Sequence, residues 1–375
     1  MPDEINPMAD MGLIHDKQTI LEPQGFLTDC DTVRDLCERF RPQGGKFYDL
    51  IDRYGIVTSY VLNRDDQGRG ADTVRMVAPF LKAFGATDYD VMRFYQEHLT
   101  TAGSAKETIK YFIDVMPTFM DSSMYEHATD ALCDKLEIPR GMASSTSLDL
   151  SDDACGMTRQ ECWDLRTMAK EIVELKMPRD KYELDVPLEL SSAETRMISA
   201  LDDIFLNRLS GTAAADMISN TVSVGANEKA YALLDIRKST QVDLDGTIYV
   251  GGDIIDYQVM DLVKDGNGLS LSFNGSEFAV HGANVAVLSK DCTVVAVLAA
   301  EFYSTGIQGV FDLVDNWNRD YLKNADCPDR NLMDRMLALN PRKLPEVYRI
   351  TRGNVGDVAA KSNAFRKRWM YRKKN

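Results

Sequence analysis

Short apolar stretches, each running into a turn or helix signal, constrain the fold of this chain most. Between them the apolar residues recur with the period of a helix. Strands that alternate with helices predict an α/β fold with a parallel sheet, and they argue against a sandwich or barrel of antiparallel strands. The predicted strands are residues 25–28, 115–120, 247–250 and 285–288, with 293–298 as a candidate fifth.

Two long helical stretches interrupt this alternation. The first contains a predicted amphipathic helix over residues 73–84, which ends at a glycine. In the second, Thr158 with Glu161 forms one predicted capping box. Ser191 with Glu194 forms another. We therefore expect helical cap insertions in an α/β core. The predicted divisions are a core of residues 22–33, 102–155 and 222–300, a cap at 34–101, a second helical insertion at 156–221, and a helical C-terminal extension with a basic tail at 301–375.

Charge is spread unevenly along the chain. The 375 residues carry a net charge of −15, which argues against a protein that mainly coats nucleic acid. From Arg342 onward the net charge is +9, which leaves −24 on the rest. Residues 366–374 mix cations with aromatic rings, as segments that bind nucleic acid or membrane surfaces do. More often such an end is a solvated terminus or docks on an acidic body, and here it is also a candidate contact for a protein partner.

Several absences in the sequence favour a cytoplasmic protein. The N-terminus shows no secretory signal, and we expect no membrane span, because the longest apolar stretch, 284–300, is interrupted by Lys290 and Asp291. The seven cysteines form no Cys-x-x-Cys pair and are typical of a reducing compartment. The four histidines lack the spacing of a zinc site.

The first candidate site is Asp29-Cys30-Asp31-Thr32-Val33, which follows the first predicted strand. The carboxyl edge of an open parallel sheet is where ligands bind. There, Asp29 is a candidate nucleophile for phosphorus, and Asp31 a candidate acid and base. Both carboxylates would repel a phosphate, so the mechanism needs a cation, and Mg²⁺ suits oxygen ligands.

Two other pairs of aspartates look similar but have a different context. Asp243 and Asp245 are preceded by polar residues and precede a predicted strand, so we interpret them as a surface turn. Asp88 and Asp90 follow the glycine that ends a helix, so we interpret them as the start of the next helix.

Three further groups follow Asp29 in order along the chain. Ser122 and Ser123, after the second predicted strand, are candidate phosphate ligands, although Ser122 also suits a helix N-cap. Lys229, near a helix start, is a candidate counter-charge for an aspartyl-phosphate, although such a lysine is more often solvated. Asp253 and Asp256 follow the strand at 247–250, where they suit either a Mg²⁺ shell or an N-cap.

Taken in order, these groups resemble the four motifs of the haloacid dehalogenase superfamily. The resemblance is closer still to an archaeal group known as subunit R of energy-converting hydrogenase A. Phrases that carry it include Ala78-Pro79-Phe80-Leu81-Lys82, Ser123-Met124-Tyr125-Glu126 and Gly268-Leu269-Ser270-Leu271. The superfamily implies a Rossmann-like core with caps, Mg²⁺ held by Asp29, Asp31, Asp253 and Asp256, and hydrolysis of a phosphomonoester.

One departure from the superfamily pattern concerns the metal. Its last motif often reads Gly-Asp-x-x-x-Asp, and here Gly252 stands where the first aspartate is expected. Three functions therefore remain open: a phosphatase for a small phosphorylated metabolite, a catalytically degenerate member that binds a ligand or partner, and another reaction on the same core. For a phosphatase, Lys46, Arg53 and Arg75 of the cap are candidate phosphate contacts.

Overall fold

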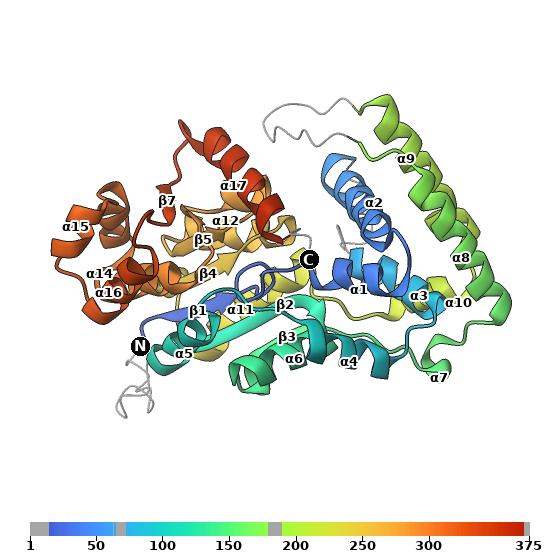
Figure 1. Ribbon diagram of the computed structural model, residues 1–375, viewed down its shortest axis with the longest axis horizontal. Helices are drawn as coiled ribbons and strands as arrows, with labels where there is room; N and C mark the ends of the chain where they lie inside the picture. The colour runs from blue at the N-terminus through green and yellow to red at the C-terminus, as the bar shows by residue number, and fades with distance from the viewer. Residues whose placement is uncertain (1–14, 63, 65–72, 179–189, 371–375) are drawn as a thin grey trace, which may run out of the picture. The chain divides into compact units, whose positions relative to one another are not determined.

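The computed structural model describes residues 15–62, 64, 73–178 and 190–370 (Figure 1). It contains a seven-stranded sheet with the strand order β3-β2-β1-β4-β5-β6-β7. The pairs of β1 with β2, β1 with β4, β4 with β5 and β5 with β6 are parallel, and β7 runs antiparallel to β6. The predicted fold class is confirmed: the chain has an α/β, Rossmann-like core with a mostly parallel sheet and helical insertions. The strands are β1 (Gln18–Leu21), β2 (Thr118–Tyr125), β3 (Ala143–Thr146), β4 (Thr247–Gly251), β5 (Leu269–Phe273), β6 (Val285–Leu288) and β7 (Glu346–Arg349).

The chain divides into two compact units, and β2 and α11 (Ala226–Thr240) run across the division. Unit 1 comprises residues 1–22, 102–120 and 230–368. Its helices are α5 (Ala105–Val115), α12 (Tyr257–Asp265), α13 (Glu277–Gly282), α14 (Thr293–Asp315), α15 (Arg319–Asn324), α16 (Arg330–Leu339) and α17 (Val355–Met370), of which the last two residues fall outside the unit. Unit 2 comprises residues 23–101, 121–229 and 369–375. Its helices are α1 (Thr32–Phe40), α2 (Gly44–Ile56), α3 (Thr73–Phe84), α4 (Asp88–His98), α6 (Glu126–Leu136), α7 (Asp152–Cys155), α8 (Arg159–Glu174), α9 (Ser192–Asp202) and α10 (Ala213–Asn220).

The core of unit 1 forms where the sheet meets α12. Ile20 of β1 pairs with Tyr249 of β4, and both side chains are buried. Val259 and Met260 of α12 pack against them in one apolar cluster. Strands that are buried along their whole length are typical of parallel sheets, whose faces are both covered by helices.

The first predicted strand is wrong. Residues 25–28 form a turn, in which the amides of Phe26, Leu27 and Thr28 all donate to the carbonyl of Pro23. The first strand is Gln18–Leu21. Its first two residues are polar, so the sequence does not show it as an apolar stretch.

The other strand predictions are confirmed only in part. The strands predicted at 247–250 and 285–288 are present. The stretch 115–120 begins as the end of α5, and β2 starts at Thr118. Residues 293–298 open α14 instead of forming a strand, and β3, β5 and β7 were not predicted.

Several local predictions about helices are confirmed. Both capping boxes are present, with Thr158 as the N-cap of α8 and Ser191 as the N-cap of α9. The helix at 73–84 is α3, and Gly85 after it has φ +94°, a left-handed conformation that favours glycine. The division of the chain into core, cap, second insertion and extension stays a prediction.

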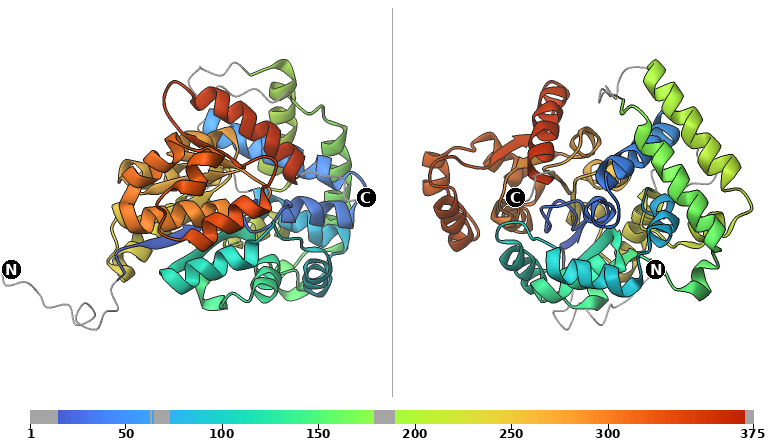
Figure 2. Two further views of the ribbon diagram at one scale, coloured as in Figure 1. Left: turned by 60° about the vertical axis from the view of Figure 1, so that its left-hand side comes forward. Right: turned by 45° about the vertical axis from the view of Figure 1, so that its right-hand side comes forward.

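The C-terminal extension ends in a docked helix within unit 1. In α17, Val358 and Ala359 are buried against Val280 and Ala286. Of the possibilities for this end, docking on the body of unit 1 is the one observed as far as Val358 and Ala359 of α17 are concerned (Figure 2). The last cations of the tail, Arg372, Lys373 and Lys374, lie outside the described residues.

Within the described ranges, one helix, α14, is long and apolar enough to cross a membrane. Of its most apolar window, 56% is buried inside the structure. Its backbone also leaves the helical conformation at Gly306, where φ is 70° and ψ is −167°. A buried core helix passes the same test of length and apolarity, so this is weak evidence for a membrane span.

Candidate functional site

The carboxyl end of β1 carries Glu22 and, after Pro23, Gln24. The backbone of Glu22 continues the sheet, because its amide donates to the carbonyl of Val250 at 2.9 Å. The side chain of Glu22 is buried. In unit 2, the side-chain oxygen of Gln24 accepts from the amide and the hydroxyl of Thr32, at 3.0 and 2.7 Å. This strand end therefore presents a glutamate and a glutamine where the sequence analysis expected Asp29 and Asp31.

Asp29 and Asp31 lie beyond the turn that follows β1. Thr100 donates its hydroxyl hydrogen bond to Asp29. Asp31 is the N-cap of α1 and accepts from the amide of Arg34 at 3.1 Å. The premise that a strand delivers these two carboxylates to the sheet edge is therefore wrong, and their roles as nucleophile and as acid and base stay predictions.

Lys229 contacts the residue before Ser122 in unit 2, and the phosphate-binding roles of Ser122, Ser123 and Lys229 stay predictions. The amine of Lys229 donates to the carbonyl of Asp121 at 2.6 Å, directly before Ser122. Lys229 and Ser122 are both fully buried. The hydroxyl of Ser122 lies 3.0 Å from that of Thr129 and accepts from the amide of Met124. Ser123, the next residue of β2, is also buried.

Asp256 in unit 1 is a fully buried carboxylate surrounded by hydrogen-bond donors. One oxygen accepts from the hydroxyl of Tyr249 at 3.0 Å. The other accepts from the amides of Gly252 and Asp253, at 2.8 and 2.9 Å. These bonds hold the loop after β4 in a closed turn.

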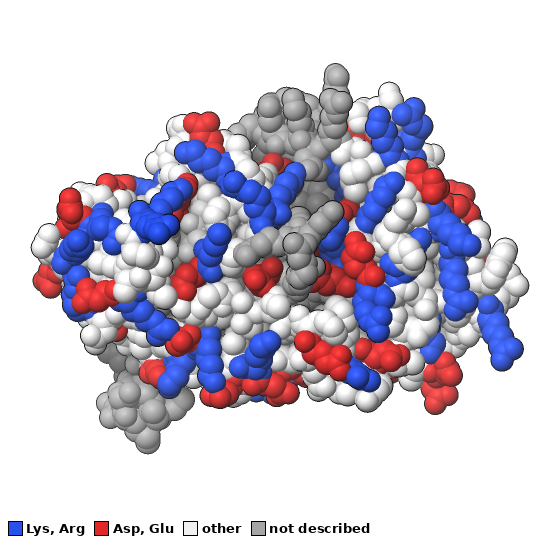
Figure 3. Space-filling view, viewed as in Figure 1, with Lys and Arg blue, Asp and Glu red and all other residues white. Residues whose placement is uncertain are grey.

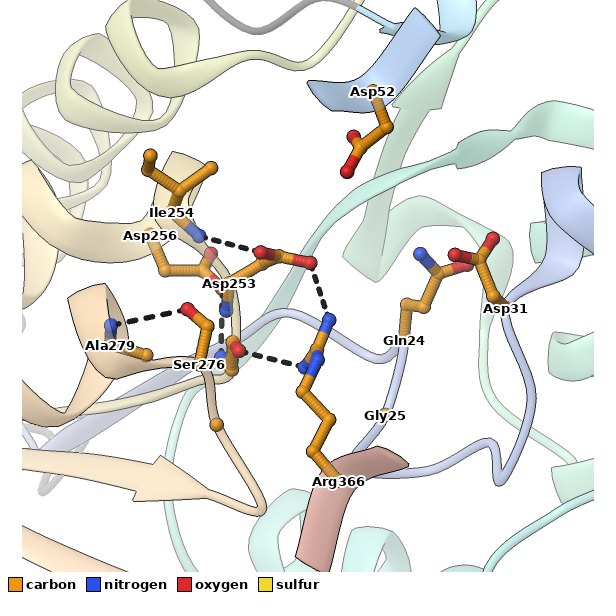
Figure 4. Close-up of polar contacts among 12 residues, drawn as sticks. Gln24, Gly25, Asp31, Asp52, Asp253, Ile254, Asp256, Ser276, Ala279 and Arg366 are labelled. Carbon is orange, nitrogen blue, oxygen red and sulfur yellow. Dashed lines mark hydrogen bonds and ion pairs between the residues drawn. The ribbon is translucent and has the colours of Figure 1, made fainter. Parts of the chain in front are cut away.

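Asp253 is the N-cap of the short helical turn Ile254–Asp256 and bonds to a guanidinium. One of its oxygens accepts from the amide of Ile254 at 2.8 Å. The other forms an ion pair with Arg366 of α17 at 2.5 Å (Figure 4). Arg366 also donates to the carbonyl of Gly252 at 2.8 Å. In the sequence, Arg366 stands out only as part of the basic tail.

The loop after β4 does not fit the Mg²⁺ that the superfamily resemblance implies. Both oxygens of Asp256 accept from protein donors, and Asp253 already has a cation beside it. Among the residues that the structure describes, no group of three or more His, Cys, Asp and Glu is placed to hold a metal ion.

The candidate phosphate contacts of the cap bind other parts of unit 2. Lys46 donates to the carbonyl of Val173 in the last turn of α8 at 2.5 Å. Arg75 donates to two carbonyls in the last turn of α10. Arg53 forms a buried ion pair with Glu194 at 2.9 Å. Cations are favourable at helix C-termini, so Lys46 and Arg75 stabilise the packing of helices.

The two other aspartate pairs lie in a turn and at a helix start, as predicted. Asp243 precedes the turn Leu244–Gly246 ahead of β4, is largely exposed, and pairs with Arg237. Asp88 and Asp90 open α4. On the face that Figure 3 shows, Lys and Arg are interspersed with Asp and Glu, which is unlike the continuous basic surface of many nucleic-acid-binding proteins.

Comparisons with known proteins concern the fold. No protein-family model matches the chain, and no curated protein matches it. Its structure is similar to that of gene product AF1437 from Archaeoglobus fulgidus, with a TM-score of 0.75 and 18% identity over 94% of this chain and 96% of that chain. It is also similar to a phospho-aspartyl intermediate analogue of phosphoserine phosphatase (TM-score 0.45, 12% identity, 75% of this chain and 97% of that chain). A phosphoserine phosphatase in apo form gives a TM-score of 0.40 at 13% identity, over 74% and 96% of the two chains. At these identities the first likeness shows a shared fold, and the two phosphatase scores are too low to support an activity.

Proposed function

We propose that this chain is a haloacid-dehalogenase-like protein that binds a ligand or a partner and does not carry out Mg²⁺-dependent phosphoryl transfer. The observation that carries the proposal is the end of β1, where Glu22 and Gln24 follow the strand. The resemblance implies two aspartates at such a strand end. A neutral amide such as Gln24 has no titratable proton, so it cannot serve as general acid or base.

The loop after β4 supports the same proposal. Asp256 stabilises the turn through three hydrogen bonds, and Asp253 is paired with Arg366. Carboxylates with these partners are typical of a structural loop. To bind a metal ion, these carboxylates would instead have to direct their oxygens at the ion.

The exposed side of α17 is the proposed contact for a protein partner. Lys367 and Arg368 are exposed on this helix, next to the buried Arg366. Such cations favour a partner with an acidic surface, because complementary charge speeds encounter.

A second candidate function is a phosphatase that uses Asp29 and Asp31 on a small phosphorylated metabolite. The contact between Lys229 and the carbonyl directly before Ser122 favours it, because the resemblance gives both residues to phosphate binding. In this reading Mg²⁺ would need ligands other than the closed loop after β4.

Turnover of a panel of phosphomonoesters, with and without Mg²⁺, separates the two functions. We expect no Mg²⁺-dependent turnover by the wild-type protein, and a rise in Tm without consumption when an ester binds. Asp29→Asn is the test variant, and Asp243→Asn, at an exposed turn, is its matched control. Mg²⁺-dependent turnover that is lost in Asp29→Asn and kept in Asp243→Asn would overturn the proposal in favour of the phosphatase.

A further inference from the structure

We infer that Arg366 is a built-in cation that takes the place of a divalent metal ion at the loop of residues 251–256. The inference deepens the proposed function and rests on it, because it explains how the loop is stabilised without a metal. All the residues that carry it belong to unit 1.

The guanidinium of Arg366 binds two successive residues of the loop. Its Nη1 donates to the carbonyl of Gly252 at 2.8 Å, and its Nη2 pairs with Oδ2 of Asp253 at 2.5 Å (Figure 4). A carbonyl oxygen and a carboxylate oxygen are the donor types that Mg²⁺ and Ca²⁺ take from proteins. The planar fork of arginine satisfies both oxygens at once with a permanent positive charge.

The glycine at position 252 fits this arrangement. A Cβ added to Gly252 would lie 3.4 Å from Nη1 of Arg366 and 3.3 Å from the carbonyl oxygen of Phe273. An aspartate at this position, as in the superfamily pattern, would therefore extend toward the space that the guanidinium occupies. The glycine at position 252 therefore leaves room for the guanidinium of Arg366.

Contacts of helix α17 with the segment after β5 hold Arg366 in position beside the loop. One turn earlier, the hydroxyl of Ser362 donates to the carbonyl of Gly275 at 2.6 Å, and both Ser362 and Arg366 are buried. Asn363 donates to Glu277 at 3.0 Å. The helix therefore docks on the segment after β5 and holds Arg366 over the segment after β4.

The loop after β4 is also joined to the segment after β5 by its backbone. The amide of Ser276 donates to the carbonyl of Gly252 at 2.9 Å, so this carbonyl accepts from both Ser276 and Arg366. Removing the guanidinium would leave an acceptor and a carboxylate without their cation. We expect this vacant position to take up a divalent ion.

The test is Mg²⁺ binding by the full chain, measured by calorimetric titration and by thermal unfolding with and without MgCl₂. The variants are Arg366→Ala, and Arg366→Ala combined with Gly252→Asp. Arg368→Ala is the matched control, because Arg368 is exposed on the same helix and donates to the carbonyl of Ala364 within it. We expect the wild type and the control to show no Mg²⁺-dependent shift. Arg366→Ala should lower Tm by about 4 °C, and the double variant should bind Mg²⁺ at least about tenfold more tightly than the wild type.

Two results would overturn the inference. One is a wild-type protein that binds Mg²⁺ as tightly as the double variant. The other is an Arg366→Ala protein as stable as Arg368→Ala. If Arg366→Ala does not fold, Arg366→Gln removes the charge but keeps a hydrogen-bond donor, and full retention of the wild-type Tm would also contradict the inference. Since turnover is not the readout, Mg²⁺-dependent ester hydrolysis by a wild type that still binds Mg²⁺ about tenfold more weakly than the double variant would overturn the proposed function and leave this inference standing.

Discussion

At the scale of single residues, the hydrogen bonds of Asp256 show that a carboxylate at a motif position can stabilise the fold of a loop. Its two oxygens accept from one hydroxyl and two backbone amides, and its side chain is fully buried. Removing the carboxylate in Asp256→Ala leaves three donors without this acceptor. Each unsatisfied buried donor costs about 1–3 kcal/mol, so we expect a loss of about 3 kcal/mol or more in the free energy of unfolding, measured by urea denaturation.

Asp243→Ala is the matched control for this variant. Asp243 pairs with Arg237 at 2.7 Å, and its side chain is 81% exposed. Exposed ion pairs contribute about 0–1 kcal/mol, so the control should remain near wild type. A loss in Asp256→Ala no larger than in Asp243→Ala would show that the loop does not depend on its buried carboxylate.

The sequence could predict that Asp253 and Asp256 follow a strand, but not which segment forms the first strand of the sheet. Gly25–Thr28 and Gln18–Leu21 are both short segments in which two consecutive apolar residues adjoin polar ones. Local sequence therefore does not tell which of the two forms a strand, and only the pairing with other strands does. The parallel bonds of β1 to β2 and to β4 select the second. The shift moves the strand end to Glu22, and Asp29 with Asp31 away from it.

At the scale of elements, the start of α9 joins a helix cap to a buried ion pair. Glu194 completes the capping box with Ser191 and pairs with Arg53 at 2.9 Å. Burial raises the pKa of Glu194, but the bonds from Ser191 and the guanidinium of Arg53 outweigh it, so the pKa lies below its usual value. A lowered pKa in the folded state means that ionised Glu194 stabilises the fold above the ordinary carboxyl pKa, and that this contribution is lost as pH falls through the folded-state value.

Glu194→Gln should therefore be destabilising by about 2 kcal/mol at neutral pH, because it leaves Arg53 buried beside a neutral group. The difference from wild type should shrink as pH falls below about 4.3. Denaturation curves at several pH values measure it. The control is Glu97→Gln, in an exposed pair with Arg93 on α4. A difference that stays constant down to pH 3 would contradict the role of the ionised carboxylate.

Helices whose starts are marked by a local sequence pattern could be predicted, whereas segments whose structure depends on packing against distant parts of the chain could not. The capping boxes of α8 and α9 lie within four consecutive residues, so the sequence alone specifies them. The valine-rich start of α14 has the composition of a strand, but it continues as a helix that is buried on both sides of its first turns. Packing against the rest of unit 1 outweighs the local preference there.

At the scale of the whole molecule, the strand order explains why the candidate site was the least predictable part. β1 lies between β2 and β4, which come about a hundred and more than two hundred residues later in the chain. The last helix, α17, then contributes Arg366 to the loop after β4. No local pattern connects the C-terminal basic segment with that loop, so a contact of this kind becomes visible only in three dimensions.

The burial of the cysteines gives a prediction about the whole fold. All seven cysteines are free thiols, of which five are buried, while Cys162 and Cys327 are partly exposed. Burial raises the pKa of Cys327 and outweighs the lowering effect of Arg330. The thiol of Cys327 is therefore mostly protonated at neutral pH. Since the thiolate is the reactive form, we expect the raised pKa to slow the reaction of Cys327 with a thiol reagent.

Titration with Ellman's reagent under non-reducing conditions should therefore give two thiols in the native protein and seven after unfolding in guanidinium chloride. Cys162→Ser and Cys327→Ser should each remove one thiol from the native count. Cys133→Ser, at a buried position, should remove one from the unfolded count alone. A native protein in which Cys133 reacts as fast as Cys162 would mean that α6 does not remain packed in solution. Fewer than seven thiols after unfolding would mean that a disulfide forms between cysteines that the fold keeps apart.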